Sequence, residues 1–96
     1  MIACYIIYSK TIDKFYIGIT QDSIASRIEK HNNKEYGMGF TSQADDWNLF
    51  FFIECKSVGQ AMNIEKHIKR MKSIKYLENL KKYPEISIRL LEKYST

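Results

Sequence analysis

The chain has 96 residues and a net charge of +4, so we expect one domain, spanning residues 1–96, with a core of modest size. No apolar run approaches the roughly 18 residues that cross a membrane, and Cys4 and Cys55 belong to no CxxC or Cys/His zinc motif. Two isolated cysteines in a chain without a signal-peptide pattern favour a reduced, cytoplasmic protein.

The positive charge is concentrated in the last third of the chain. Residues 1–65 contain six Lys/Arg and eight Asp/Glu, which gives −2, whereas residues 66–96 contain nine Lys/Arg and three Asp/Glu, which gives +6. A one-sided basic surface suits a polyanion such as nucleic acid. A solvated helix face explains the same charges equally well.

Two segments near the N-terminus, residues 2–9 and 15–20, are rich in β-branched and aromatic residues, and a short polar stretch separates them. This pattern predicts a β-hairpin. If the turn consists of residues 12–13 alone, Ile7 faces Gly18. Because side chains alternate along strands, Tyr5 and Tyr16 then emerge on one face, with Gly18 leaving a notch between them.

The first helix is expected from a cap at Asp22 or Ser23 to about residue 32. Arg27 and His31 are four residues apart and therefore share a face of this helix. Residues 32–46 contain two glycines and scattered polar residues, which indicates a loop. The strongly apolar segment 47–56 predicts a third strand.

Ser57 and Gln60 have the spacing of a capping box and open a second helix. Its apolar residues fall on one expected inward face: Val58, Ala61, Met62, Ile64, Ile68 and Met71. Glu65 lies within that arc. A carboxylate there is costly unless it is paired or binds a metal. A salt bridge to a nearby lysine, or a rotated helix that exposes Glu65, would explain it without a metal.

Ser73 can cap a third helix that ends near Lys82, and Pro84 marks the start of a last helix. The predicted element order is therefore ββαβααα. This order corresponds to an α+β domain with a small, three-stranded, mostly antiparallel sheet flanked by helices.

Taken singly, each polar or aromatic residue has an ordinary structural explanation, but their combination resembles the GIY-YIG nuclease family. In that family a hairpin carries Gly-Ile-Tyr and Tyr-Ile-Gly, followed by an arginine on the first helix and a glutamate on a later one. The matching residues here are Tyr5, Tyr16-Ile17-Gly18, Arg27, His31, Glu65 and Asn79. The chain is similar to small stand-alone members and to the nuclease domain of the bacterial excision-repair incision protein, a resemblance that implies a role in DNA repair.

The sequence departs from the family pattern at two places. Ala3 and Cys4 replace the glycine and isoleucine of the first motif, although its tyrosine is present as Tyr5. The stretch from Tyr16 to Arg27 is one residue longer than usual. Only the tyrosine of the first motif has a proposed chemical role, so the first departure does not exclude activity.

The resemblance implies a DNA endonuclease that depends on Mg²⁺ or Mn²⁺ and needs no small-molecule cofactor. Glu65 would bind the metal, Arg27 would stabilise the transition state, Tyr5 or Tyr16 would be the general base with Tyr5 preferred, and His31 would assist. DNA-backbone contacts are expected from Lys66, Lys69, Arg70, Lys72 and Asn79. Two alternatives remain: a nucleic-acid-binding module without turnover, and a small structural or adaptor protein in which these residues only pack.

Overall fold

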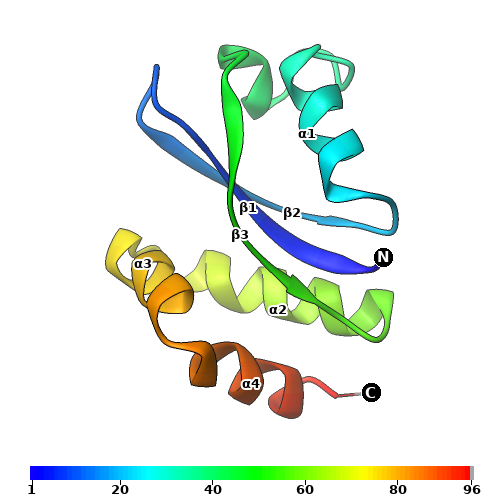
Figure 1. The fold of residues 1–96 in the computed structure, drawn as a ribbon, viewed down its shortest axis with the longest axis vertical. Coiled ribbons are helices and arrows are strands. Elements are labelled where there is room, and N and C mark those ends of the chain that lie inside the picture. The colour runs from blue at the N-terminus through cyan, green and yellow to red at the C-terminus, as the bar shows by residue number, and fades with distance from the viewer. Residues whose placement is uncertain (96) are drawn as a thin grey trace.

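A three-stranded antiparallel sheet, with strand order β2-β1-β3, organises the protein (Figure 1). This computed structural model describes residues 1–95. The elements are β1 (Ala3–Ser9), β2 (Lys14–Thr20), α1 (Ile24–Asn32), the short 3₁₀ helix η1 (Phe40–Gln43), β3 (Trp47–Glu54), α2 (Val58–Met71), α3 (Ile74–Lys82) and α4 (Pro84–Lys93). The predicted α+β class and the order ββαβααα are confirmed. None of the helices within residues 1–95 is both long and apolar enough to cross a membrane.

Each helix of the α type begins at a residue that favours a helix start, either a capping serine or Pro84. The hydroxyl oxygens of Ser23, Ser57 and Ser73 accept hydrogen bonds from backbone N–H groups three residues on, at the starts of α1, α2 and α3. Pro84 occupies the first turn of α4. These starts agree with the predicted ones because an N-cap is a contact within a few residues.

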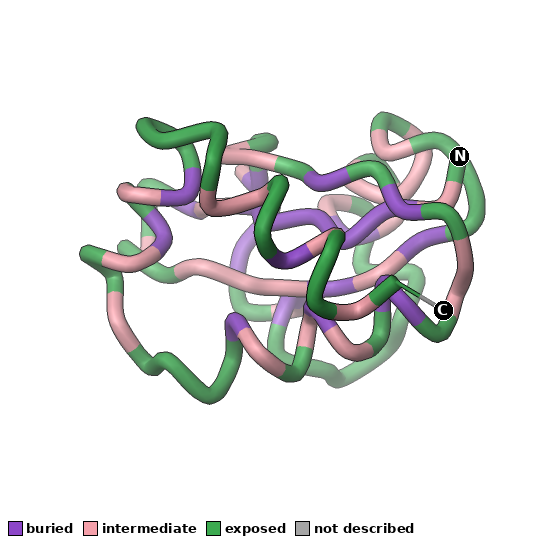
Figure 2. Tube along the Cα trace, turned by 90° about the horizontal axis from the view of Figure 1, so that it is seen from below, coloured by how far each residue is buried: buried purple, intermediate pink, exposed green. Residues whose placement is uncertain are grey.

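The two faces of the sheet carry different side chains. Cys4 and Ile6 of β1 point to one face and pack with Ile64 and other apolar residues of α2, α3 and α4. Tyr5 and Ile7 point to the other face, which α1 and the loop before β3 cover. Buried positions gather in the central strand β1 and in the interior of the molecule, while the outer sides of the helices are exposed (Figure 2).

The hairpin register differs by two residues from the predicted one. Tyr5 lies opposite Gly18 and Ile7 lies opposite Tyr16, because residues 10–13, and not only 12–13, form the turn. Since side chains alternate with a period of two, this shift leaves Tyr5 and Tyr16 on the same face, as expected.

Contacts from outside the hairpin stabilise the wider turn. The Asp46 carboxylate accepts hydrogen bonds from Ser9 Oγ, from Thr11 Oγ1 at 2.7 Å and from Thr11 N at 3.0 Å. These hydrogen bonds lower the pKa of Asp46 to about 2. Asp13, in the left-handed region with φ of 52°, accepts a hydrogen bond from Tyr8 Oη.

Two predictions about α2 are wrong. Met62 and Met71 are exposed and do not point into the core, whereas Ala61, Ile64 and Ile68 are buried. The core face of α2 is therefore narrower than the apolar residues of its sequence suggest. Cys4 and Cys55 are free and buried, as expected.

A β-bulge in β3 places two consecutive residues of the apolar run 49–53 on the same face of the sheet. Ile6 pairs with Phe51 and Ile7 pairs with Leu49, so Phe50 is the extra residue of β3. Phe50 and Phe51 both pack against the core formed with α2, α3 and α4. Leu49 therefore falls on the opposite face, together with Phe52.

Candidate active site

One pocket of about 270 Å³ is lined by all five residues that the sequence selects for catalysis: Tyr5, Tyr16, Arg27, His31 and Glu65. The two tyrosines come from adjacent strands, Arg27 and His31 from α1, and the glutamate from α2. Residues separated by up to 60 positions in the chain thus meet at one concave surface. The sequence predicted the shared face of Tyr5 with Tyr16 and that of Arg27 with His31.

Gly18 allows the two tyrosines to approach each other. The rings of Tyr5 and Tyr16 are 6.5 Å apart between centroids. A Cβ atom on Gly18 would lie 2.7 Å from Tyr5 Oη and 3.0 Å from Tyr16 Cε2, both too close for van der Waals contact. The position requires a residue without a side chain because the Tyr5 hydroxyl occupies that space.

A chain of hydrogen bonds runs from the pocket into the protein. Tyr5 Oη lies 2.8 Å from His31 Nε2, and His31 Nδ1 lies 2.7 Å from Thr41 Oγ1. All three residues are buried. Trp47 Nε1 donates a hydrogen bond of 2.9 Å to the Thr41 carbonyl, so the last residue of this hydrogen-bond network is anchored to β3.

Thr41 is a site residue that sequence reasoning missed. It lies in η1, within a segment whose sequence indicates only a loop. A threonine in a loop has no periodicity to reveal its direction. In the sequence, Thr41 is marked only by its place between the histidine of the first helix and Trp47. Such an arrangement is too common to predict a contact.

The tyrosine and the histidine of this chain are both held in their neutral forms. Burial raises the pKa of Tyr5 to about 12. Burial and the nearby Arg27 guanidinium lower the pKa of His31 below its usual range. At neutral pH the Tyr5 phenol is therefore hydrogen-bonded to an uncharged His31 imidazole, and both side chains are neutral.

Arg27 is fixed in place but retains free hydrogen-bonding capacity. Its Nη2 atom donates to the carbonyl of Ile19 at 3.3 Å, and its guanidinium lies 5.2 Å from the centroid of the Tyr36 ring. Its Nε atom is buried without a partner among the described residues. Arg27 also lines the pocket, where Nη donors that are not used by Ile19 are suitable contacts for an anionic oxygen.

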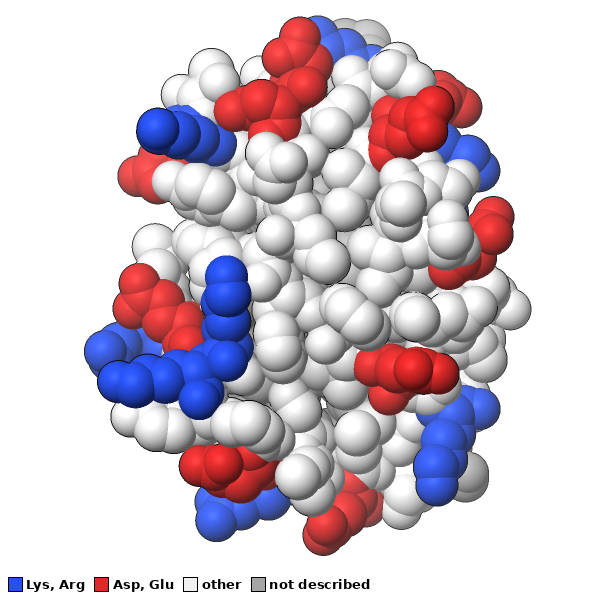
Figure 3. Space-filling view, viewed as in Figure 1, with Lys and Arg blue, Asp and Glu red and all other residues white. Residues whose placement is uncertain are grey.

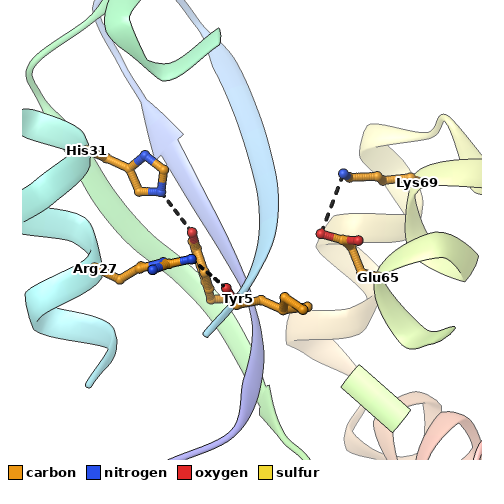
Figure 4. A network of polar contacts seen from close by, with 6 residues as sticks. Tyr5, Arg27, His31, Glu65 and Lys69 are labelled. Atoms are coloured by element: carbon orange, nitrogen blue, oxygen red, sulfur yellow. Dashed lines mark hydrogen bonds and ion pairs between the residues drawn. The ribbon is translucent and has the colours of Figure 1, made fainter. Parts of the chain in front are cut away.

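Glu65 reaches the pocket from the opposite side of the sheet. Figure 4 shows Tyr5, Arg27 and His31 on one side of the strands, with Glu65 and Lys69 on the other. The Glu65 side chain is 20% exposed and its Oε2 atom lies 3.5 Å from Lys69 Nζ. The prediction that Glu65 lies on the buried apolar face is therefore wrong, since it lies at the edge of that face, where the pocket opens.

The ion pair with Lys69 is the contact that a purely structural explanation of Glu65 requires. Lys69 is 51% exposed, and the two residues are four apart on α2. An i,i+4 pair on a helix in which one partner is exposed contributes only about 0.3–0.5 kcal/mol. Lys69 can therefore leave the carboxylate at little cost when another cation approaches.

Comparison with known proteins agrees with this geometry. The family model for the GIY-YIG catalytic domain matches residues 1–78, which include the whole pocket. The chain belongs to the GIY-YIG family. Members of this family are endonucleases, generally dependent on divalent metals. No curated protein and no solved structure matches the chain.

The donor set suits the kind of metal that GIY-YIG nucleases use. Glu65 is the single carboxylate that lines the pocket, and residues 1–95 contain no group of three or more His, Cys, Asp or Glu that could hold a metal. Mg²⁺ is commonly held by one or two carboxylates, with water and phosphate oxygens completing its shell. Zinc requires a fuller set of nitrogen or sulfur ligands.

The residues predicted to contact DNA divide into two groups on this GIY-YIG domain. Lys69 and Lys72 line a second pocket, of about 330 Å³, together with Lys14 of β2. Lys66 and Arg70 are exposed and lie about 100° further round α2, away from the core.

Asn79 does not line the catalytic pocket. It is half-buried on α3, where its carbonyl caps the helix by accepting from Tyr83 N. The face drawn in Figure 3 carries a cluster of basic side chains over α3 with acidic atoms beside it, and single basic and acidic side chains are scattered over the rest of the face. The positive charge of the C-terminal third is thus interspersed with acidic groups on this face.

Proposed function

We propose that this protein is a divalent-metal-dependent endonuclease that hydrolyses DNA phosphodiester bonds. The observation that carries the proposal is the meeting of two tyrosines, an arginine, a histidine and a carboxylate in one pocket. Hydrolysis of a phosphodiester requires a water proton to be removed and negative charge on the phosphoryl oxygens to be stabilised. This pocket offers groups for both tasks.

Tyr5 and His31 act together as the base. With the His31 Nδ1 proton donated to Thr41, Nε2 is an acceptor for the Tyr5 hydroxyl proton. As Tyr5 Oη takes a proton from the attacking water, its own proton passes to Nε2. The pKa of Tyr5, near 12, disfavours a free phenolate, and this relay avoids one because the charge moves to the imidazole.

Thr41 is a positioning residue in this scheme. Its hydroxyl selects the His31 tautomer that leaves Nε2 free to accept a proton. The bond from Trp47 to the Thr41 carbonyl restrains the loop that carries it. Tyr16 lies on the open side of Tyr5 and contacts the attacking water or a phosphate oxygen.

Arg27 binds the scissile phosphate and stabilises the charge that accumulates on it during attack. The Nη donors that the Ile19 carbonyl leaves free supply the hydrogen bonds. Glu65 would hold the metal, which when bound would supply Lewis-acid stabilisation of the developing negative charge. Lys69 then gives up its weak ion pair and turns to a neighbouring phosphate.

Cleavage of labelled DNA tests the proposal. Single strands, duplexes, nicked duplexes and branched duplexes are incubated with Mg²⁺, with Mn²⁺ or with a chelator. We expect cleavage of at least one substrate with metal and none with chelator. Glu65→Gln should lose metal-dependent cleavage, whereas the exposed Glu78→Gln of α3 should retain it. Metal-dependent binding of DNA without any cleavage would instead identify a binding module.

A further inference from the structure

The loop between α1 and β3 exposes large apolar side chains beside the catalytic pocket. Tyr36 is 41% exposed, Phe40 is 43% exposed and Met38 is fully exposed. Tyr36 and Phe40 line the pocket, and the catalytic scheme assigns neither of them a role. Exposed aromatic rings at the mouth of a site are common contacts for a ligand with a flat face.

Phe40 is held against one of the catalytic tyrosines. Its ring lies nearly parallel to that of Tyr16, with an interplanar angle of 19° and 6.2 Å between centroids. A second contact, 6.2 Å between centroids, joins Phe40 to the buried Trp47. The ring is therefore supported by packing while much of its surface remains open to solvent.

Tyr36 is supported in the same way by the other catalytic residues. Its ring centroid lies 4.6 Å from that of His31 and 5.2 Å from the Arg27 guanidinium carbon. The residues between the two rings leave room: Gly37 adopts a φ of +74°, and a Cβ atom on Gly39 would meet nothing within 4 Å. Two supported rings thus lie at the pocket, joined by a segment whose glycines have open space around them.

We propose that Tyr36 and Phe40 form an aromatic clamp that stacks on an unpaired nucleobase next to the scissile phosphate. The inference rests on the proposed function and specifies its substrate class: DNA with unpaired nucleotides at the cut. Aromatic side chains bind single strands by stacking, which tolerates any base because every base has a flat face. In a duplex those faces are already stacked on neighbouring bases, and only the edges are accessible.

The position of the clamp favours a nucleic acid over a small aromatic ligand. The Arg27 guanidinium contacts the Tyr36 ring and is also the proposed phosphate ligand. A base stacked on Tyr36 and a phosphate bound to Arg27 would therefore belong to the same nucleotide or to adjacent nucleotides. Lys69 and Lys72, in the second pocket beside Glu65, supply positive charge for further phosphates of the same strand.

Binding without cleavage tests the clamp separately from catalysis. A single-stranded oligonucleotide carrying 2-aminopurine, and the same oligonucleotide annealed to its complement, are titrated with protein in the presence of chelator. We expect tighter binding of the single strand and quenching of 2-aminopurine fluorescence at one position. Phe40→Leu should weaken single-strand binding by roughly 5- to 100-fold, in line with the loss of one stacked base, and leave duplex binding unchanged.

Two further variants separate stacking from general apolar contact. Phe40→Trp keeps a flat ring and should retain the preference and the quenching. Phe52→Leu changes a phenylalanine of similar exposure, 38%, that lies on β3 outside the pocket, and should bind as the parent does. If Phe40→Leu binds single strands as tightly as the parent, or weakens duplex binding equally, the clamp is wrong.

Failure of the clamp and failure of the proposed function give different results. A parent protein that quenches 2-aminopurine and prefers single strands, yet cleaves nothing with Mg²⁺ or Mn²⁺, retains the clamp and loses the nuclease. A parent protein that cleaves intact duplex and single strands equally, with no effect of Phe40→Leu, retains the nuclease and loses the clamp.

Discussion

The two faces of the sheet differ in chemistry although one strand, β1, contributes to both. On one face Cys4 and Ile6 join an apolar core built with α2, α3 and α4. On the other face Tyr5 and Ile7 pack with Trp47. Two buried polar residues lie there as well: His31 is hydrogen-bonded to both Tyr5 and Thr41. One face is typical of a core that stabilises a fold, and the other is typical of a reactive site.

The difference follows from what covers each face. Three helices cover the apolar face, and Leu77, Leu80 and Leu90 complete its core. The other face is covered by α1 and by a loop that includes η1, so a pocket remains between them. Glu65 connects the two sides because α2 runs along the edge strand β2 and brings one polar side chain to the pocket. Substitutions on the two faces should therefore affect different measurements.

The largest effect is expected from Arg27→Ala, on the pocket side. Its loss should reduce cleavage by at least about 10²–10³-fold, because the guanidinium contacts charge that forms mainly in the transition state. DNA binding in chelator should change far less. Arg27→Lys keeps the charge but not the forked geometry, and should recover only part of the rate. Cleavage by Arg27→Ala at the parent rate would show that the arginine is structural.

Leu80→Ala, on the opposite face, should give the converse result. Leu80 is fully buried, and truncating it costs about 2–5 kcal/mol of the free energy of unfolding through lost transfer energy and a cavity. Urea denaturation measures the loss. Cleavage well below the unfolding midpoint should remain within a few-fold of the parent. A loss of cleavage as large as that of Arg27→Ala would mean that the two faces are coupled.

Gly18→Ala sharpens the comparison, because it adds only one methyl group on the pocket side. The new Cβ would meet Tyr5 Oη at 2.7 Å and Tyr5 Cζ at 2.8 Å, so the phenol must shift, which disturbs its 2.8 Å contact with His31 Nε2. We expect a cost of about 1–3 kcal/mol in stability and a larger proportional loss of cleavage. A Gly59→Ala variant, where the added atom meets only Ser57 Oγ at 4.0 Å, is the matched control.

The pH profile of cleavage tests whether Tyr5 works through His31. Because the pKa of His31 is lowered, cleavage should persist somewhat below pH 6.5 and then fall up to tenfold per pH unit as the imidazole gains a proton. Unfolding should also become easier as the pH falls through 6.5, because the unfolded chain binds that proton more readily.

The alkaline side of the same profile separates the relay from a phenolate base. The pKa of Tyr5 is about 12, so the relay predicts a plateau between about pH 7 and pH 9. A free phenolate would make cleavage rise about tenfold per pH unit over that range. Tyr5→Phe should abolish cleavage across the whole pH range. Single-turnover rates at saturating protein are the appropriate measurement.

Much of the fold could be predicted because its signals are local. Serine caps, the period of apolar residues and Pro84 identify the helices, and each signal spans only a few residues. The register of the hairpin could not be predicted, since Asp46, which lies 35 positions from Thr11, holds the wider turn. The shared face of the two tyrosines was nevertheless predicted correctly because the error was an even number of residues.

The site was predictable only where residues lie on regular elements. Tyr5, Tyr16, Arg27 and His31 have directions that strand and helix periods determine. Glu65 was assigned to the right helix but to a buried position. The period of apolar residues gives the direction of a side chain, but at the edge of an apolar face it does not determine how exposed that side chain is. Four other pocket residues lie in the loop, where no period gives a direction: Tyr36, Gly39, Phe40 and Thr41.

The smallest effect is expected from charge on α2, where two matched pairs of substitutions can be compared. Lys69→Gln with Lys72→Gln removes two charges beside the second pocket, and Lys66→Gln with Arg70→Gln removes two from the outer face. Each DNA phosphate contact contributes about 0.7–0.9 to the slope of log affinity against log salt. In chelator at low salt, the first pair of substitutions should therefore weaken DNA binding several-fold. It should also reduce the slope by up to the contribution of two phosphate contacts. The second pair should change the slope little, because charges that point away from the bound strand act only through a screened field. Equal losses from both pairs would mean that DNA lies across the outer face of α2, and not along the path from Arg27 past Glu65 to Lys72.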